Sequence, residues 1–168
     1  MRRRLFSPEA DQRVKYTRHV SAGMIVFHRA EGGCRFLLVL SRLTKRPLWE
    51  FPKGGVDEGE TLIETATREL EEETGLTAQN ISIVPGFQRT EDYRFSSGQG
   101  QERTLIHKRV TYFLAESDTM EVTVAQKEIS QHAWLELADA VRKLKYKERR
   151  QLLQEAAAFA GCAAATSS

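Results

Sequence analysis

The chain has 168 residues, of which 40% are hydrophobic and 29% are charged, and its formal net charge is +2 at pH 7. This length and apolar content predict one folded domain with a real core, and they exclude wholesale disorder. The balance of 25 basic and 23 acidic side chains excludes a strongly basic polyanion binder, so we expect no DNA partner.

The apolar runs are all too short to span a bilayer, and the N-terminus lacks the apolar stretch of a signal peptide. The two cysteines, Cys34 and Cys162, form neither a CxxC motif nor a metal-binding spacing. That pattern favours a reducing compartment. We therefore expect a cytoplasmic protein with no membrane partner.

The chain begins with a basic segment. Residues 1–18 hold six basic and two acidic side chains, and their polar, Pro-containing sequence predicts a loose arm or an edge segment. We expect a single domain over residues 19–162, because no linker or repeat divides the chain. Residues 163–168 should form a frayed tail.

The first part of the expected domain has the pattern of β-strands. Residues 21–28 and 35–40 are apolar and β-branched, and the Glu-Gly-Gly turn at 31–33 predicts that they form a hairpin. After a basic loop at 42–47, the Pro-Lys-Gly-Gly sequence at 52–55 should interrupt regular structure.

A helix is expected next. Thr61 and Glu64 fit a capping box, and Gly75 fits a helix end, so the helix should span Thr61–Thr74. The remaining predicted elements are strands at 81–84, 86–95, 106–115, 121–124 and 133–135, and then one or two helices over 137–144 and 147–160. Strands that outnumber interleaved helices predict an α/β fold with helices packed on a mixed sheet.

The acidic residues gather in the predicted helix. Residues 54–76 hold eight acidic side chains and one basic side chain, and Glu69, Glu72 and Glu73 fall within about a 100° arc of the helix. Carboxylates at this spacing repel each other by roughly 3 kcal/mol per pair. They therefore favour a bound cation, unless they form an ordinary solvated face. Hard divalent ions prefer such oxygen ligands.

The turn before the helix supports the same chemistry. Lys53-Gly54-Gly55 lets the backbone approach a ligand closely beside a cation, although the chain lacks the spacing of a Walker A loop. A glycine-rich turn that leads into a capped, acidic helix favours metal-assisted displacement at phosphorus. Divalent cations there would neutralise phosphate oxygens and lower the pKa of a bound water.

These positions together resemble a known family motif. The pattern Gly54-x5-Glu60-x7-Arg68-Glu69-Leu70-x-Glu72-Glu73-x-Gly75-Leu76 matches every fixed position of the 23-residue Nudix box. The resemblance implies an α/β/α sandwich in which the box helix packs on a mixed sheet. It also implies a Mg²⁺- or Mn²⁺-dependent hydrolase of nucleoside diphosphates linked to another moiety, acting on a phosphoric anhydride bond.

The resemblance further implies roles for individual residues. Glu60 and Arg68 would hold the acidic side chains in place, whereas the plainer interpretation of Arg68 is a helical pair with Glu64. The implied metal ligands are the backbone carbonyl of Gly54 and the catalytic side chains of Glu69, Glu72 and Glu73.

Outside the motif, the chain is similar to asymmetrical diadenosine tetraphosphate hydrolases over roughly residues 20–160. The similarity rests on Pro52-Lys53-Gly54, on residues 86–93 and on a late Glu that precedes a Trp-Leu pair. It implies that Lys53 contacts phosphate, that Tyr93 stacks on adenine and that Glu128 joins the metal site. The other candidate substrate-binding residues are Arg42, Arg89 and His132.

The leading hypothesis is a nucleotide polyphosphate hydrolase that converts diadenosine tetraphosphate to ATP and AMP by in-line attack of metal-activated water. A second hypothesis, favoured by residues 49–55 and the basic arm, is removal of pyrophosphate from triphosphorylated RNA 5′ ends. A third is a Nudix module that senses a nucleotide without turnover, although such modules usually lose box carboxylates and none is lost here. The oligomeric state stays open.

Overall fold

The structure is a computed structural model that describes residues 14–42, 45–98, 102–125 and 127–162. Most of the predicted basic arm and the whole predicted tail lie outside this range. The described residues form seven strands and three helices. In chain order they are β1 (Lys15–Ala30), β2 (Gly33–Ser41), β3 (Leu48–Glu50), β4 (Lys53–Gly55), α1 (Leu62–Thr74), β5 (Ile81–Ser97), β6 (Thr104–Ser117), β7 (Ile129–Leu135), α2 (Leu137–Lys143) and α3 (Lys147–Phe159).

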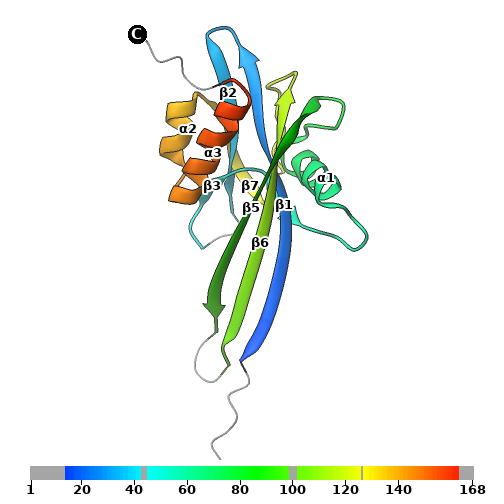
Figure 1. The fold of residues 1–168 in the computed structure, drawn as a ribbon, viewed down its shortest axis with the longest axis vertical. Coiled ribbons are helices and arrows are strands. Elements are labelled where there is room, and N and C mark those ends of the chain that lie inside the picture. Colours follow the sequence, from blue (N-terminus) through cyan, green and yellow to red (C-terminus); the bar gives the residue numbers. More distant parts are fainter. Residues whose placement is uncertain (1–13, 43–44, 99–101, 126, 163–168) are drawn as a thin grey trace, which may run out of the picture.

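The strands form one mixed sheet with helices on both faces. Its order is β3-β2-β1-β6-β5, with β4 paired to β1 and β7 paired to β2. Strands β1 and β6 run parallel, and the other pairs are antiparallel. Helix α1 covers one face, while α2 and α3 cover the other (Figure 1). The predicted α/β/α sandwich with a mixed sheet is thereby confirmed.

The side chains of β1 point alternately to the two faces of the sheet, and the core therefore has two layers. Ile25 and Phe27 are fully buried in the cluster that contains the apolar residues of α2 and α3. Met24 and Val26 point to the opposite face and are buried with Ala66 of α1 and its neighbours. Because successive side chains of a strand point to opposite faces, one apolar run builds both layers.

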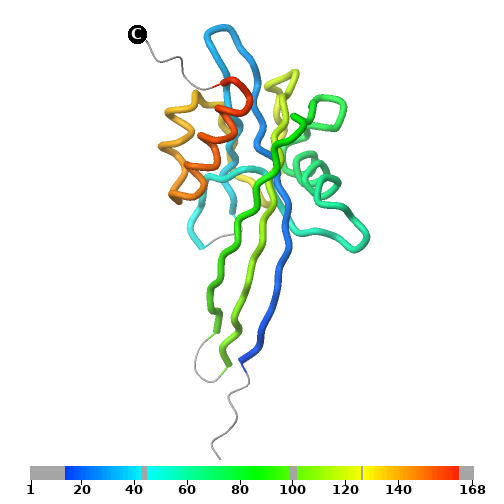
Figure 2. The backbone as a smooth tube through the Cα atoms, viewed as in Figure 1, coloured from blue at the N-terminus to red at the C-terminus, as the bar shows by residue number. Residues whose placement is uncertain are grey.

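Several strands are longer than the sequence predicted. Strands β1, β5 and β6 continue together beyond the helices, as the tube in Figure 2 shows. Strand β1 begins at Lys15, within the range that the sequence assigned to the arm. The two strands predicted at 81–84 and 86–95 are one strand with an irregularity between Ile83 and Gln88.

Two sequence-based expectations are wrong. Residues 53–55 form β4 rather than an interruption, because Lys53 and Gly54 pair with Gly23 and Ala22 of β1. No strand exists at 121–124 among the described residues. This segment instead runs past the C-terminal end of α1, where the Thr123 amide donates to the Thr74 carbonyl oxygen at 2.9 Å.

Helix α1 is specified by local sequence. The Thr61 side chain accepts from the Glu64 amide, and the Glu64 carboxylate accepts from the Thr61 amide, which completes the predicted capping box. Gly75 ends the helix in the left-handed conformation at φ 75°, where its amide donates to the Glu71 carbonyl oxygen. The helix start and end are therefore confirmed.

Cys34 and Cys162 form a disulfide, with their Cα atoms 5.7 Å apart. The bond joins the first residues of β2 to the segment after α3. The sequence-based argument for a reducing compartment rested on the absence of a paired cysteine motif, and the fold removes that argument because it brings these distant residues together. In the described part of the chain, no helix is both long and apolar enough to cross a membrane.

Candidate metal centre and substrate pocket

Three carboxylates converge beside α1. Glu69, Glu73 and Glu128 each offer an oxygen, and these atoms lie within 4.8 Å of one another. Glu69 and Glu73 share a helix face because they are four residues apart. Glu128 arrives from the segment before β7, whose position is fixed where the Arg42 amide donates to the Glu128 carbonyl oxygen at 2.7 Å. We call these three residues the carboxylate cluster.

Two members of the carboxylate cluster, Glu69 and Glu73, are buried, and Glu128 is partly exposed. Burial raises the pKa of Glu73 to about 8, and the neighbouring carboxylates of Glu69 and Glu50 add to that rise. Burial also raises the pKa of Glu69, although Arg68 opposes the shift. Three oxygens held this close at a buried site match the ligand preference of a hard divalent cation. The donor set therefore fits the metal that the motif implies.

Gly54 makes room for the cluster. A β-carbon at this position would overlap the carboxylate of Glu69. The strand β4 can thus lie directly against the acidic side of α1 only because residue 54 has no side chain. This close approach also keeps the Gly54 backbone next to the carboxylate cluster.

Arg68 organises the box residues. Its Nε donates to Glu60 Oε2 at 2.7 Å, and its Nη1 donates to Glu69 Oε1 at 2.9 Å. The guanidinium lowers the pKa of the Glu60 carboxyl to about 2. Glu64, the alternative partner, accepts from the Thr61 amide instead. Arg68 therefore links Glu60 to the carboxylate cluster and orients Glu69.

Glu72 lies apart from the carboxylate cluster. Its side chain is 56% exposed, and its carboxylate accepts from Arg68 Nη1 at 3.2 Å. The structure thus brings together Glu69, Glu73 and Glu128, while Glu72 is on the solvent side of Arg68. The metal-ligand role implied for Glu72 stays a prediction.

A cavity of about 670 Å³ has Lys53, the residue before Gly54, in its lining. The Lys53 Nζ is 3.6 Å from Oε2 of Glu50, which also lines the cavity. Burial lowers the pKa of Lys108 to about 8, and the nearby cation of Lys53 contributes. The charged and aromatic residues of this substrate pocket are Glu50, Lys53, Glu91, Asp92, Tyr93, Arg94, Phe95, Lys108, Tyr146, Glu148 and Arg149.

Arg149 of α3 closes the substrate pocket from above the sheet. Its Nε donates to Glu91 Oε2 at 2.6 Å. Its guanidinium carbon lies 5.8 Å from the ring centre of Tyr93 and 5.3 Å from that of Tyr112. The buried Arg149 guanidinium therefore lies over the Tyr93 ring.

The sequence analysis missed Glu50, Lys108, Tyr146 and Arg149 as pocket residues. The strand register contains a usable signal for Lys108, which lies directly opposite Tyr93 in the β5–β6 pair. Cross-strand neighbours share a face of the sheet. The residues of α3 offer no such signal, because their place depends on how the helix packs on the sheet.

The other candidate binding residues lie outside the substrate pocket. Arg89 is partly buried, with its Nε 3.0 Å from Glu155 Oε2 and its guanidinium carbon 4.5 Å from the Phe87 ring centre. His132 is exposed on β7, opposite Val39. Arg42 is exposed beside the backbone of Glu128. The structure does not bring the Arg89, His132 and Arg42 side chains into one cavity with Tyr93.

The fold, the capped acidic helix and the glycine-lined carboxylate cluster define a class of enzyme. A family model described as the NUDIX domain matches residues 17–156. The chain therefore belongs to the Nudix family and is a pyrophosphohydrolase of that family. Divalent metals are typical of this family, and the carboxylate cluster is consistent with that chemistry.

Known proteins similar to this chain include asymmetrical bis(5'-nucleosyl)-tetraphosphatases. The mouse protein is 37% identical over 112 residues, which cover 66% of this chain and 71% of the relative. The pig protein is 30% identical over 145 residues, or 83% of this chain and 93% of the relative. A crystal structure of a C. elegans Ap4A hydrolase binary complex matches with a TM-score of 0.73 at 28% identity, covering 85% of this chain and 98% of that one.

Proposed function

We propose that this enzyme hydrolyses dinucleoside polyphosphates, with diadenosine tetraphosphate split into ATP and AMP. The observation that supports this most directly is that Lys53, which precedes the Gly54 packed on Glu69, lines a pocket together with Lys108, Arg149 and the Tyr93 ring. The names of its relatives, asymmetrical bis(5'-nucleosyl)-tetraphosphatases, agree with this assignment. Magnesium or manganese is the proposed cofactor.

In this proposal, basic residues of the pocket bind the phosphates and an aromatic residue binds the base. Lys53 immediately precedes Gly54 and reaches into the pocket, so it can pair with a phosphate next to the cluster. Lys108 and Arg149 extend the positive charge along the same cavity. Tyr93 offers its ring for stacking on adenine, a contact of about 1–3 kcal/mol in other nucleotide-binding proteins.

The carboxylate cluster would hold the metal ion that activates the attacking water. A divalent cation held there would offset phosphate charge and lower the pKa of a water. Glu69 and Glu73 would hold that cation from α1, and Glu128 from the opposite side. Water would then attack one phosphorus in line with the bridging oxygen, and a carboxylate would accept its proton. The bond from that phosphorus to the bridging oxygen breaks, and the second nucleotide leaves with that oxygen.

The decisive experiment identifies products in ¹⁸O-labelled water. Diadenosine tetraphosphate and Mg²⁺ should yield ATP and AMP in equal amounts, with the label in only one of them. Two molecules of ADP would contradict asymmetrical cleavage. Glu72→Gln, which removes a carboxylate that the Nudix box implies as a metal ligand, should lower turnover by orders of magnitude, whereas Glu71→Gln, an exposed neighbour on the same helix, should not.

The same assay separates the competing functions. Triphosphorylated RNA is measured alongside the dinucleotide at equal concentration. Faster release of pyrophosphate from RNA would replace the proposed substrate by an RNA 5′ end. No turnover of any nucleotide with Mg²⁺ or Mn²⁺ would instead favour a sensing module.

A further inference from the structure

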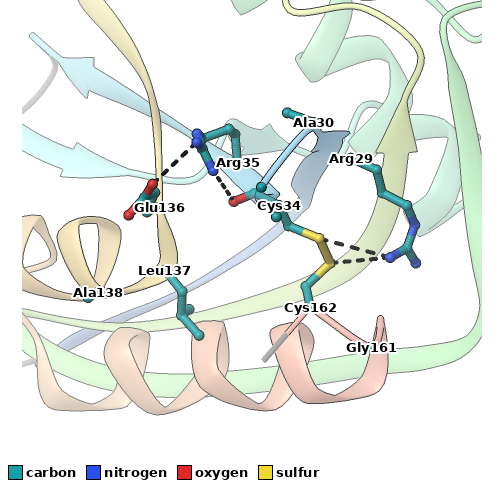
Figure 3. A pocket seen from close by; sticks show the side chains of 11 residues that line it. Arg29, Ala30, Cys34, Arg35, Glu136, Leu137, Ala138, Gly161 and Cys162 are labelled. Carbon is teal, nitrogen blue, oxygen red and sulfur yellow. Dashed lines mark hydrogen bonds and ion pairs between the residues drawn. A yellow bond between two sulfur atoms is a disulfide. The ribbon is translucent and has the colours of Figure 1, made fainter. Parts of the chain in front are cut away.

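A second cavity lies where the β1–β2 hairpin meets the end of α3 (Figure 3). Its volume is about 530 Å³, and the disulfide between Cys34 and Cys162 forms part of its wall. Both cysteines are partly exposed. The proposed hydrolase function does not use this cavity, which shares no lining residue with the substrate pocket.

A guanidinium group faces both sulfur atoms. Arg29 Nη1 lies 3.9 Å from Cys34 Sγ and 3.8 Å from Cys162 Sγ. Two further contacts hold this side chain, because its Nη2 donates to the Ala160 carbonyl oxygen at 2.7 Å and its Nε is 3.3 Å from Glu116 Oε1. A cation beside a sulfur stabilises its thiolate form. Either cysteine can therefore leave as a thiolate when the disulfide is attacked.

The charges of the cavity lining favour a negatively charged ligand. Arg29 and Arg35 both line it, whereas Glu136 is its one acidic lining residue. Arg35 Nη1 donates to the Cys34 carbonyl oxygen at 3.2 Å, and its Nη2 is 3.2 Å from Glu136 Oε1. Figure 3 shows Arg29 beside the two sulfur atoms, whereas Arg35 points toward Glu136 on the other side of Cys34. The lining residues thus carry one net positive charge, with Arg29 next to the sulfur atoms, while Glu116 pairs with Arg29 from outside the lining.

We propose that this cavity, the exchange cavity, docks a small anionic thiol that reduces the Cys34–Cys162 disulfide. The thiolate attacks one cysteine Sγ, the sulfur–sulfur bond breaks, and its electron pair leaves on the other cysteine as a thiolate. A second thiolate then attacks the mixed disulfide. It releases the second cysteine thiolate and a small-molecule disulfide, so two thiols supply the two electrons.

The test measures reduction rates of the full chain by acid quench, alkylation and mass spectrometry. Glutathione, 2-mercaptoethanol and cysteamine serve as negative, neutral and positive thiols at equal thiolate concentration. Glutathione should react roughly tenfold faster than cysteamine, since a local positive field concentrates anions. Its rate should rise linearly with thiol concentration, and a glutathione adduct on Cys34 or Cys162 should appear first.

Variants that each change one charge then test whether the preference for glutathione arises in the exchange cavity. Arg35→Gln should remove most of the preference for glutathione. Glu136→Gln should increase the preference for glutathione, because it removes the one acidic residue of the lining. The change should leave α2 intact, since the Glu136 side chain makes no cap hydrogen bond to that helix. Arg18→Gln, at the far end of β1, makes the same charge change outside the cavity and should leave the preference intact.

Three outcomes would overturn the proposal. The three thiols could react equally, or Arg35→Gln and Arg18→Gln could have the same effect. The rate could also stop rising with thiol concentration at the rate of global unfolding, which would show a structural cross-link closed to solvent. These results concern only the disulfide, so they stand apart from the outcome of the nucleotide assay.

Discussion

Replacing Glu73 by Gln should stabilise the metal-free protein. The Glu73 residue is 4% exposed, and its pKa rises from 4.5 to about 8 on folding. The folded state therefore binds this proton more tightly than the unfolded state does. Stability is complete below pH 4.5 and falls as the pH rises toward 8, by about 1.4 kcal/mol per pH unit. The loss reaches about 3 kcal/mol at pH 7 and about 4 kcal/mol at pH 8, where the folded state is half ionised.

Glutamine has nearly the same shape but carries no charge, so Glu73→Gln avoids this loss. Urea unfolding in a chelator should give wild type and variant similar stability at pH 4.5, with the variant ahead by a few kcal/mol at pH 8. Magnesium should reverse the order, because a ligand that binds only the folded state stabilises it by RT ln(1 + [L]/Kd). The variant should gain much less from magnesium.

Glu71→Gln is the matched control, since it removes a carboxylate from the exposed side of the same helix. It should show neither effect. The reasoning fails if Glu73→Gln is less stable than wild type at pH 8 in the chelator. It also fails if magnesium stabilises both proteins equally, because Glu73 would then contribute nothing to a metal site.

Four further predictions follow from single contacts. Tyr93→Ala should raise KM for diadenosine tetraphosphate more than it lowers kcat, since stacking is mostly uniform binding; steady-state kinetics would contradict this if KM stayed unchanged. Gly54→Ala should displace the Glu69 carboxylate and weaken magnesium binding in calorimetry, because the two groups overlap. Cys34→Ser should lower the free energy of unfolding by up to about 5 kcal/mol in the chain-entropy account of a 128-residue loop, and added reductant should then have no further effect. Glu60 contributes stability above pH 4.5 that is lost as the pH falls toward 2, so Glu60→Gln should flatten acid unfolding in that window.

Local patterns in the sequence were sufficient to predict α1. Its start, its end and the shared face of Glu69 and Glu73 follow from residues within four positions of one another. The strand at 53–55 could not be predicted this way. A glycine pair has little strand preference, and β4 exists because β1 offers it a pairing edge.

The remaining site depends on contacts between distant segments. Glu128 was placed by family resemblance, and the residue spacing alone does not show that it faces α1. Arg149 reaches Glu91 only because α3 packs over β5, and the two residues are 58 positions apart. The cysteine spacing likewise gave no hint of a disulfide across 128 residues. Such pairings depend on tertiary packing, which short-range patterns do not encode.

The disulfide turns most of the polypeptide into a covalent ring. The ring runs from Cys34 to Cys162 and contains the whole acidic helix and the walls of the substrate pocket. A protease that cuts once inside it, for example at the exposed turn near Glu58, leaves two fragments that stay attached. Nicked enzyme would then migrate as one intact species on a gel run without reductant, and it would separate into two bands only after the sulfur bridge is opened.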